Sequence, residues 1–202
     1  MNPENKRNLK NPKQTELFSA KNDFSDYSQS NNLFNQSREE IIEWKKKINK
    51  YQQNILKDIN DPYFQKSFIE SKDDFNIKNI NPFSLASHSI NFWRSNKLIS
   101  KSSAMYFVID NIINSEIILY IGETFSADKR WKGVHDCKTY INNYKEALSS
   151  HKIESHLNIR FLLDVPKDVK FRRKLERKLI YLWFPPFNKE TRNIWSTTFT
   201  NN

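Results

Sequence analysis

The sequence contains very little cysteine and glycine. Its single cysteine, Cys137, excludes an internal disulfide and any zinc site built from several cysteines. Only two glycines occur among 202 residues, Gly122 and Gly133. We therefore expect each glycine to stand where the backbone needs a positive φ or where another group approaches the main chain closely.

Long apolar runs are absent as well. No stretch approaches the roughly 18 apolar residues of a membrane-spanning helix, and the polar N-terminus has no apolar signal-peptide core. Only 37% of the residues are hydrophobic, so a core spread over the whole chain would be thin. The sequence predicts a soluble, cytoplasmic protein with no membrane contact and no disulfide-linked partner.

Charge, in contrast, is plentiful and unbalanced. Lysine and arginine number 33 against 23 aspartates and glutamates, which gives a net charge of +10. Such an excess favours a polyanionic partner, and nucleic acid more than a membrane. A basic surface that only aids solubility is the alternative, because charge alone is not specific.

The first half of the chain predicts little regular structure. Residues 1–36 are rich in Asn, Ser, Lys and Gln without a period, so we expect them to be disordered. A helix is predicted over about residues 37–58, because Ser37 and Glu40 have the capping-box spacing. Its apolar stripe consists of Ile41, Trp44, Ile48, Tyr51 and Ile55. We expect this helix to pack on the following domain, through an irregular connection that reaches residue 102.

Residues 103–193 predict a small α+β domain, followed by a tail over 194–202. Strand-like runs at 105–109 and 117–121 form a hairpin, and a third strand covers 159–163. A helix from about residue 126 separates the hairpin from the third strand, and a last helix spans about 168–184. The first helix carries an apolar stripe of Cys137, Tyr140, Ile141, Tyr144, Ala147 and Leu148. The predicted fold is a three-stranded antiparallel sheet flanked by helices, in the order β-β-α-β-α.

Two tyrosines lie on the predicted hairpin. If Ile113 is near its centre, Tyr106 faces Tyr120, and a register slip of two residues keeps both on one face of the sheet. Gly122 follows directly. The alternative is a cross-strand pair that only stabilises the sheet.

The last predicted helix combines one carboxylate with many cations. Glu176 lies at the edge of its apolar stripe, where a carboxylate can bind a hard cation such as Mg²⁺. The alternative is an ion pair with Arg172 or Arg173. The flanking cations favour phosphate contacts, although such a run is also typical of a solvated helix face: Arg172, Arg173, Lys174, Arg177 and Lys178.

In this order, the motifs resemble the GIY-YIG nuclease superfamily over roughly residues 103–193. Ala104-Met105-Tyr106 stands in place of the first signature, and Tyr120-Ile121-Gly122 matches the second. Asp128-Lys129-Arg130-Trp131-Lys132 resembles the helix that carries the family's arginine, and His135 stands near its usual histidine. Glu176 matches the metal-binding glutamate, and Asn188 matches the late asparagine.

The resemblance implies a DNA endonuclease that uses one divalent metal ion, Mg²⁺ or Mn²⁺. Glu176 would hold the metal on the scissile phosphate, and Tyr106 would help deprotonate the attacking water. Arg130 would neutralise charge on the phosphate. Tyr120 and His135 would orient groups or relay protons, and Asn188 would support the site.

Some alternatives stay open at this stage. The spacing from Arg130 to His135 is one residue longer than is usual in the family, and Gly133 would have to absorb it. Otherwise Lys129 or Lys132 takes the place of His135. The expected contacts to nucleic acid are Lys129, Lys132, Arg172, Arg173 and Arg177. The alternative function is a catalytically inactive module of the same fold that only binds nucleic acid.

Overall fold

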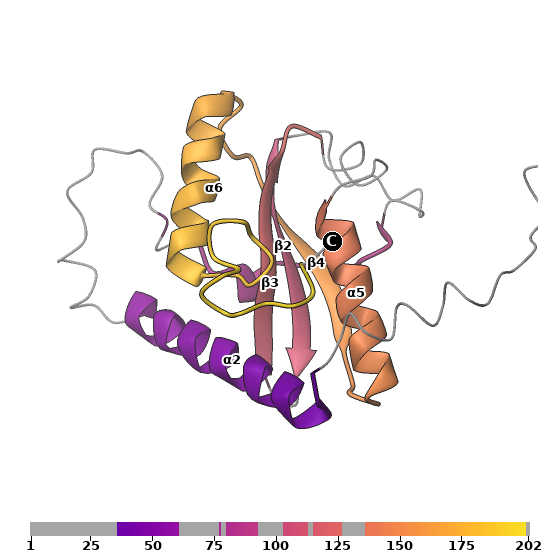
Figure 1. Cartoon of the computed structure of the whole chain (residues 1–202). Coiled ribbons are helices and arrows are strands. Elements are labelled where there is room, and N and C mark those ends of the chain that lie inside the picture. The colour runs from indigo at the N-terminus through magenta and orange to yellow at the C-terminus, as the bar shows by residue number, and fades with distance from the viewer. Residues whose placement is uncertain are drawn as a thin grey trace, which may run out of the picture. The chain divides into compact units, whose positions relative to one another are not determined.

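One antiparallel sheet organises the part of the chain that the structure describes. The computed structural model describes residues 36–60, 77, 80–92, 103–112, 115–126 and 136–200. Its strands are β1 (Ser87–Ser89), β2 (Ala104–Ile112), β3 (Ser115–Thr124) and β4 (His156–Leu163), in the order β1-β4-β2-β3. The helices are α2 (Arg38–Asn60), α5 (Asp136–Ser150) and α6 (Val169–Trp183), and a 3₁₀ turn, η3, covers Pro82–Ser84 (Figure 1). The predicted α+β class is confirmed. The segment expected to be disordered lies outside the described residues, apart from Gln36.

The sheet has one strand more than the sequence predicted. β1 pairs antiparallel with β4, from Ser87 opposite Arg160 to Ser89 opposite Asn158. This stretch was predicted to be irregular, because Ser-His-Ser carries no alternation of apolar and polar side chains. The three-stranded prediction is therefore wrong: β1 owes its place to backbone pairing with β4, which leaves no trace in its own side chains.

Strands β2 and β3 form the predicted hairpin, with a β-bulge. Tyr106 pairs with Gly122, two residues away from the predicted pairing with Tyr120. A slip of two residues leaves both tyrosines on the same face of the sheet. The register shifts after Val108, so Leu119 on β3 has no cross-strand partner.

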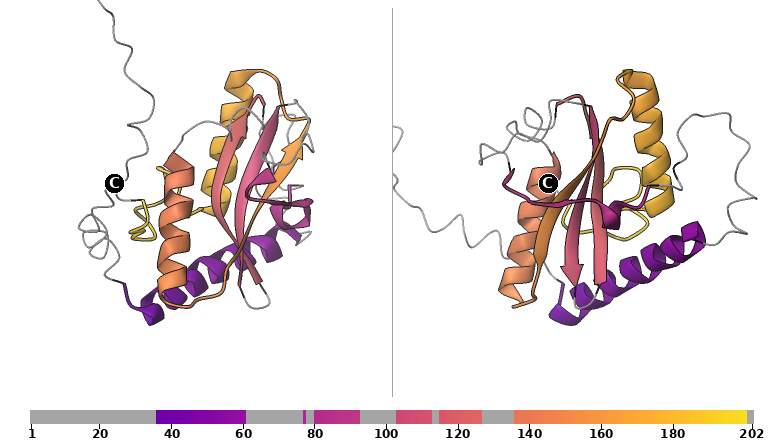
Figure 2. Two further views of the ribbon diagram at one scale, coloured as in Figure 1. Left: turned by 90° about the vertical axis from the view of Figure 1, so that its right-hand side faces the viewer. Right: turned by 180° about the vertical axis from the view of Figure 1, so that it is seen from behind.

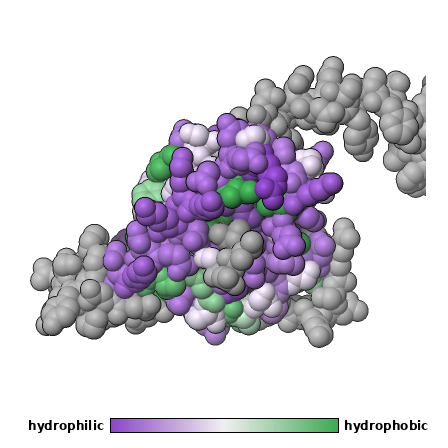
Figure 3. All heavy atoms as spheres, turned by 90° about the horizontal axis from the view of Figure 1, so that it is seen from below, coloured by the Kyte–Doolittle hydropathy of each residue, from purple (hydrophilic) through white to green (hydrophobic). Residues whose placement is uncertain are grey.

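Helix α2 starts at the predicted capping box. The N–H of Ser37 donates to Glu40 Oε2 at 2.7 Å, and the N–H of Glu40 donates to Ser37 Oγ at 3.2 Å. Ile41 and Ile48 on its apolar stripe are fully buried, so α2 packs on the sheet as expected. Seen from below, the side of the molecule along which α2 runs is largely hydrophilic (Figure 3).

Helices α6 and α5 cover opposite faces of the sheet (Figures 1 and 2). Asp168 caps α6, because its side chain accepts from the N–H groups of Lys170 at 2.8 Å and Phe171 at 3.1 Å. The helix ends at Phe184, whose φ of 43° lies in the left-handed region, just before two prolines. Every residue of the predicted α5 stripe is buried. On the other face a core joins α6 to the hairpin: Met105, Phe107, Ile109, Ile118, Ile121, Leu175, Leu179, Ile180 and Trp183.

Side-chain amides cover the outer edge of β3. Gln52 of α2 donates to the carbonyl of Ile118 at 3.0 Å and accepts from its N–H at 2.8 Å. Asn188, which follows α6, donates to the carbonyl of Ile121 at 2.8 Å and accepts from its N–H at 3.0 Å. Each amide therefore reproduces the two hydrogen bonds that a further strand would make.

A buried ion pair at the hairpin end of the sheet connects helices α2 and α5 with strands β2 and β4. Asp110 of β2 accepts from Lys45 Nζ of α2 at 2.8 Å and from the Tyr144 hydroxyl of α5 at 2.7 Å. Its other oxygen accepts from Ser155 Oγ at 2.7 Å and from the N–H of His156 at 2.9 Å. Burial, and then the Asp110 carboxylate, raises the pKa of Tyr144 well above its ordinary value.

The segment predicted to be a tail belongs to the core as far as residue 200. Phe199 is buried, with its ring centroid 5.3 Å from that of Trp44 and 5.3 Å from that of Tyr144. Trp44 Nε1 also donates to the carbonyl of Trp195 at 3.0 Å. A lone aromatic residue in a polar run has no periodicity, which is why the sequence failed to predict this packing.

Cys137 is buried in α5 and forms no disulfide. Among the described helices, none has both the length and the apolar composition needed to cross a membrane.

Candidate functional site

A pocket of about 420 Å³ opens beside β3 and is lined by residues of both flanking helices. Three of the residues predicted for the site line it, namely Tyr120, Glu176 and Asn188. They come from β3, from α6 and from the segment after α6, so the fold brings together residues that are far apart in the sequence. The remaining lining residues are Asp136, Cys137, Tyr140, Ile180, Phe187, Lys189 and Glu190.

The two hairpin tyrosines stack behind this pocket. Their ring centroids are 5.9 Å apart and the ring planes are inclined by 24°. Tyr120 is partly exposed and lines the pocket, whereas Tyr106 is fully buried. Tyr120 therefore contributes to the pocket wall, and Tyr106 stacks on it from the buried side.

Gly122 is required by this arrangement. The Tyr106 ring lies so close to Gly122 that an added Cβ would be 2.8 Å from Tyr106 Cε1 and closer still to Cζ and the hydroxyl oxygen. Gly122 has no positive φ, so it serves the close approach of a side chain and not an unusual backbone conformation. This confirms one of the two roles expected for a rare glycine.

Glu176 is held on the edge of the sheet. Its Oε1 accepts a hydrogen bond from the N–H of Glu123 at 3.1 Å, and the side chain lies beside buried residues of α6, as its place at the edge of the apolar stripe predicted. The pKa of Glu176 is raised to about 7, mainly by burial and then by the nearby carboxylates of Glu123 and Glu190. The hydrogen bond from Glu123 and the charge of Arg173 oppose this shift. Glu176 is thus a carboxylate in acidic surroundings.

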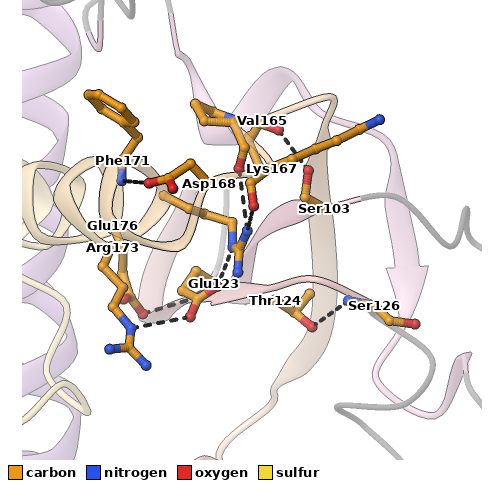
Figure 4. Close-up of polar contacts among 12 residues, drawn as sticks. Ser103, Glu123, Thr124, Ser126, Val165, Lys167, Asp168, Phe171, Arg173 and Glu176 are labelled. Atoms are coloured by element: carbon orange, nitrogen blue, oxygen red, sulfur yellow. Dashed lines mark hydrogen bonds and ion pairs between the residues drawn. The ribbon is translucent and has the colours of Figure 1, made fainter.

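The two arginines beside Glu176 pair with Glu123. The Arg172 guanidinium bonds to the Glu123 carboxylate and to the carbonyls of Pro166 at 3.3 Å and Lys167 at 2.9 Å (Figure 4). Arg173 Nε lies 3.8 Å from Glu123 Oε1. The ion pair considered for Glu176 is therefore made by Glu123.

Arg172 also corrects the predicted set of nucleic-acid contacts. Its side chain is only 3% exposed, because it fills a position of the buried α6 stripe between β3 and the loop before the helix. It cannot present its guanidinium to a phosphate in this conformation. Arg173 and Arg177, in contrast, are exposed on α6.

Asn188 lines the pocket from the segment that follows α6. It is buried, and both ends of its amide bond to the backbone of Ile121. Since Tyr120 and Gly122 flank Ile121 in the chain, Asn188 fixes the stretch of β3 on which Tyr120 stands. Its side chain positions the pocket wall.

The pocket also contains charged residues that the sequence did not single out. Lys189 and Asp136 form an ion pair at 3.5 Å, and both are largely exposed. Glu190 follows Lys189 directly. The only sequence signal for these residues is their position, next to Asn188 in the chain or at the start of α5. That signal is too weak to predict a site residue.

Four predicted site residues lie outside the described part of the chain. Arg130, His135, Lys129 and Lys132 all belong to residues 127–135, which also contain Gly133. Their roles stay predictions.

The described residues fit a metal held by a single carboxylate. Among them, no three His, Cys, Asp or Glu side chains are grouped to enclose an ion. Mg²⁺ is commonly held by one or two carboxylates, with water and substrate phosphate as its other ligands. Glu176 suits this pattern, because its acidic neighbours favour a cation and it lines a pocket large enough to admit a phosphate group.

Comparison with known proteins adds no further assignment. No family model, no curated protein and no solved structure matches this chain.

Proposed function

We propose that this chain is a metal-dependent DNA endonuclease that hydrolyses phosphodiester bonds with one divalent cation. The observation that carries the proposal is the meeting of Tyr120, Glu176 and Asn188 in one pocket, with Tyr106 stacked behind Tyr120. The same residues carry the resemblance of the sequence to GIY-YIG nucleases. The net charge of +10 supports a polyanionic substrate.

In this proposal Glu176 holds Mg²⁺ or Mn²⁺. When bound, the cation supplies Lewis-acid activation of the scissile phosphate and stabilisation of the leaving oxygen. A nearby cation favours the ionised form of a carboxylate, so it would reverse the raised pKa of Glu176.

The protein's own groups position the reactants. Tyr120 lines the pocket and its hydroxyl orients the water that attacks phosphorus, while Tyr106 holds the Tyr120 ring by stacking. Water adds to phosphorus, the bond to the leaving oxygen breaks, and that oxygen gains a proton. Arg130 neutralises charge on the phosphate and His135 relays protons, as the resemblance implies. A cytoplasmic location is part of the same proposal, because the expected substrate is DNA.

The test is cleavage of supercoiled plasmid by the full chain, with Mg²⁺ or Mn²⁺ against EDTA. We expect metal-dependent nicking that Glu176→Gln reduces to background. The glutamine keeps an oxygen for the N–H of Glu123, so the variant removes the charge and preserves the hydrogen bond. Glu146→Gln, an exposed position on α5, is the charge-matched control and should cleave like the unaltered chain.

Two results would contradict the proposal. Equal cleavage by Glu176→Gln and the unaltered chain would remove Glu176 from the site. DNA binding without cleavage, under every metal and on plasmid, single-stranded and branched DNA alike, would leave a module that only binds nucleic acid.

A further inference from the structure

Phe125 is an exposed aromatic residue at the end of β3. Its side chain is 61% exposed, although phenylalanine is a large apolar residue. The Arg172 guanidinium carbon lies 6.0 Å from the centre of the ring. Because Arg172 is buried and bonded to Glu123, it forms a fixed support for the ring.

The local hydrogen bonds hold Phe125 beside the candidate site. Glu123, two residues earlier, binds Glu176 through its N–H and Arg172 through its carboxylate. One residue later, the N–H of Ser126 donates to Thr124 Oγ1 at 3.0 Å, which fixes the direction of the chain as it leaves the strand (Figure 4). Phe125 is therefore attached to the same cluster that positions Glu176.

A second exposed phenylalanine provides a comparison. Phe171 is 63% exposed and lies in the first turn of α6. It precedes Glu176 by five residues, which places it about 140° away around the helix axis. In Figure 4 its ring points away from Glu123. The two phenylalanines are equally exposed, but only Phe125 is attached to the Glu123–Glu176 cluster.

Cations accompany Phe125 on this side of α6. Arg173 is 71% exposed and lies 3.8 Å from the Glu123 carboxylate. Phe125 and Arg173 are both connected to Glu123, and an exposed aromatic ring combined with an exposed arginine suits single-stranded nucleic acid, because the ring stacks on a base and the cation contacts the backbone. Within a duplex both faces of a base are already stacked, and inserting a ring between two bases costs unstacking energy, so an aromatic ring stacks more readily on an unpaired base.

We propose, on the premise of the nuclease function above, that Phe125 stacks on an unpaired base beside the scissile phosphate. The substrate is then single-stranded or locally unpaired DNA. Phe125 positions this substrate and takes no part in the chemistry.

Binding tests this proposal independently of cleavage. The full chain with Glu176→Gln is titrated against a fluorescein-labelled 20-nucleotide single strand and the matching blunt duplex, with anisotropy as the readout. We expect tighter binding to the single strand. Adding Phe125→Ala should weaken single-strand binding at least about fivefold, and Phe125→Trp should restore it. Phe171→Ala is the matched control and should change neither affinity.

Salt dependence and abasic DNA separate stacking from charge. Phe125→Ala should leave the slope of log affinity against log salt unchanged, whereas Arg173→Ala should reduce it by about 0.7. A series of single strands is then tested, each with one abasic position at a different place. The Glu176→Gln chain should bind one of these strands more weakly than the others, whereas the chain that also carries Phe125→Ala should bind all of them equally.

An unchanged single-strand affinity in Phe125→Ala, or equal losses for single strand and duplex, would overturn the role of Phe125. Plasmid cleavage by the unaltered chain reports separately on the nuclease. If Phe125→Ala weakens single-strand binding but the unaltered chain does not cleave plasmid, the stacking role is supported and the nuclease function is contradicted. If the chain cleaves plasmid but Phe125→Ala binds normally, the nuclease function is supported and the stacking role is contradicted.

Discussion

Asp110 and Glu176 are carboxylates in contrasting surroundings at the two ends of the β2–β3 hairpin. Asp110 is fully buried, and a lysine, a tyrosine, a serine and a backbone N–H satisfy its two oxygens. Glu176 accepts one backbone N–H, faces a pocket and has other carboxylates nearby. A buried charge that is paired on all sides joins parts of the fold. A carboxylate whose ionisation is opposed by burial and by neighbouring carboxylates is instead a candidate functional group.

Removing the cation at the Asp110 end should have the largest effect. Lys45→Met leaves the Asp110 carboxylate buried without its counter-charge, so we expect the free energy of unfolding to fall by about 3–5 kcal/mol. Urea denaturation measures this change. Lys46→Met, on an exposed neighbouring residue, is the control and should cost less than about 0.5 kcal/mol. A loss below about 1 kcal/mol for Lys45→Met would show that the pair does not hold the fold together.

Removing the charge of Glu176 should increase the free energy of unfolding, in contrast to the loss expected at Asp110. The folded chain binds the Glu176 proton more tightly than the unfolded chain, because folding raises the pKa from 4.5 to about 7. The resulting stabilisation is complete below about pH 4.5 and is lost as the pH rises through about 7. Glu176→Gln should therefore match the unaltered chain near pH 4 and exceed its stability near pH 8.5, by up to about 3 kcal/mol.

Urea denaturation of both proteins across this pH range provides the measurement. Glu146→Gln should show no such gain at high pH. If Glu176→Gln were less stable than the unaltered chain at pH 8.5, the carboxylate would be a stabilising group like Asp110, and the contrast between the two ends would disappear.

The close packing of Gly122 on Tyr106 should be sensitive to a single methyl group. Gly122→Ala forces the Tyr106 ring to move, and overpacking of this kind costs about 1–3 kcal/mol. In a Tyr106→Leu background the same substitution should cost clearly less, because the ring that it overlaps is gone. Thermal unfolding of the unaltered chain, the two single variants and the double variant measures the coupling energy between Gly122 and Tyr106. Equal costs in both backgrounds would contradict the packing argument.

Metal binding should produce the smallest effect. Mg²⁺ at ten times its dissociation constant would add about 1.4 kcal/mol to the stability of the folded chain. The shift should appear near pH 8 and should be absent in Glu176→Gln. Thermal unfolding with and without Mg²⁺ detects it, with Ca²⁺ as a second hard cation. An equal shift in the variant would place the metal elsewhere.

The sequence predicted elements that have a strong period. All six residues of the α5 stripe are buried, and the capping box of α2 forms as expected. The two tyrosines share a face even though the register differs by two residues, because side-chain direction repeats every two residues along a strand. Glu176 and Asn188 were found by resemblance and lie at one pocket.

What escaped prediction depends on partners distant in the chain. Arg172 was expected to contact nucleic acid because it lies in a run of cations, yet it is buried and bonds to Glu123 and two carbonyls. Lys45 lies among exposed lysines of α2, and only its pairing with Asp110 sets it apart. β1 is held by its pairing with β4 and by the contact of His88 with Phe161, and Phe199 by an aromatic cluster assembled from several segments. None of these positions carries a periodic signal.

The side-chain amides of Gln52 and Asn188 determine which segments of the chain are needed to cover the edge of β3. An uncovered edge strand offers its N–H and C=O groups to another polypeptide, which leads to edge-to-edge aggregation. Here the bonds of Ile118 and Ile121 are already taken by a helix that precedes the hairpin and by a segment that follows α6. A chain shortened to residues 103–193 would keep the motifs of the site but lose Gln52, and the edge of β3 would be open to self-association at Ile118. The part of the chain that covers the edge of β3 therefore begins with α2, well before Tyr106.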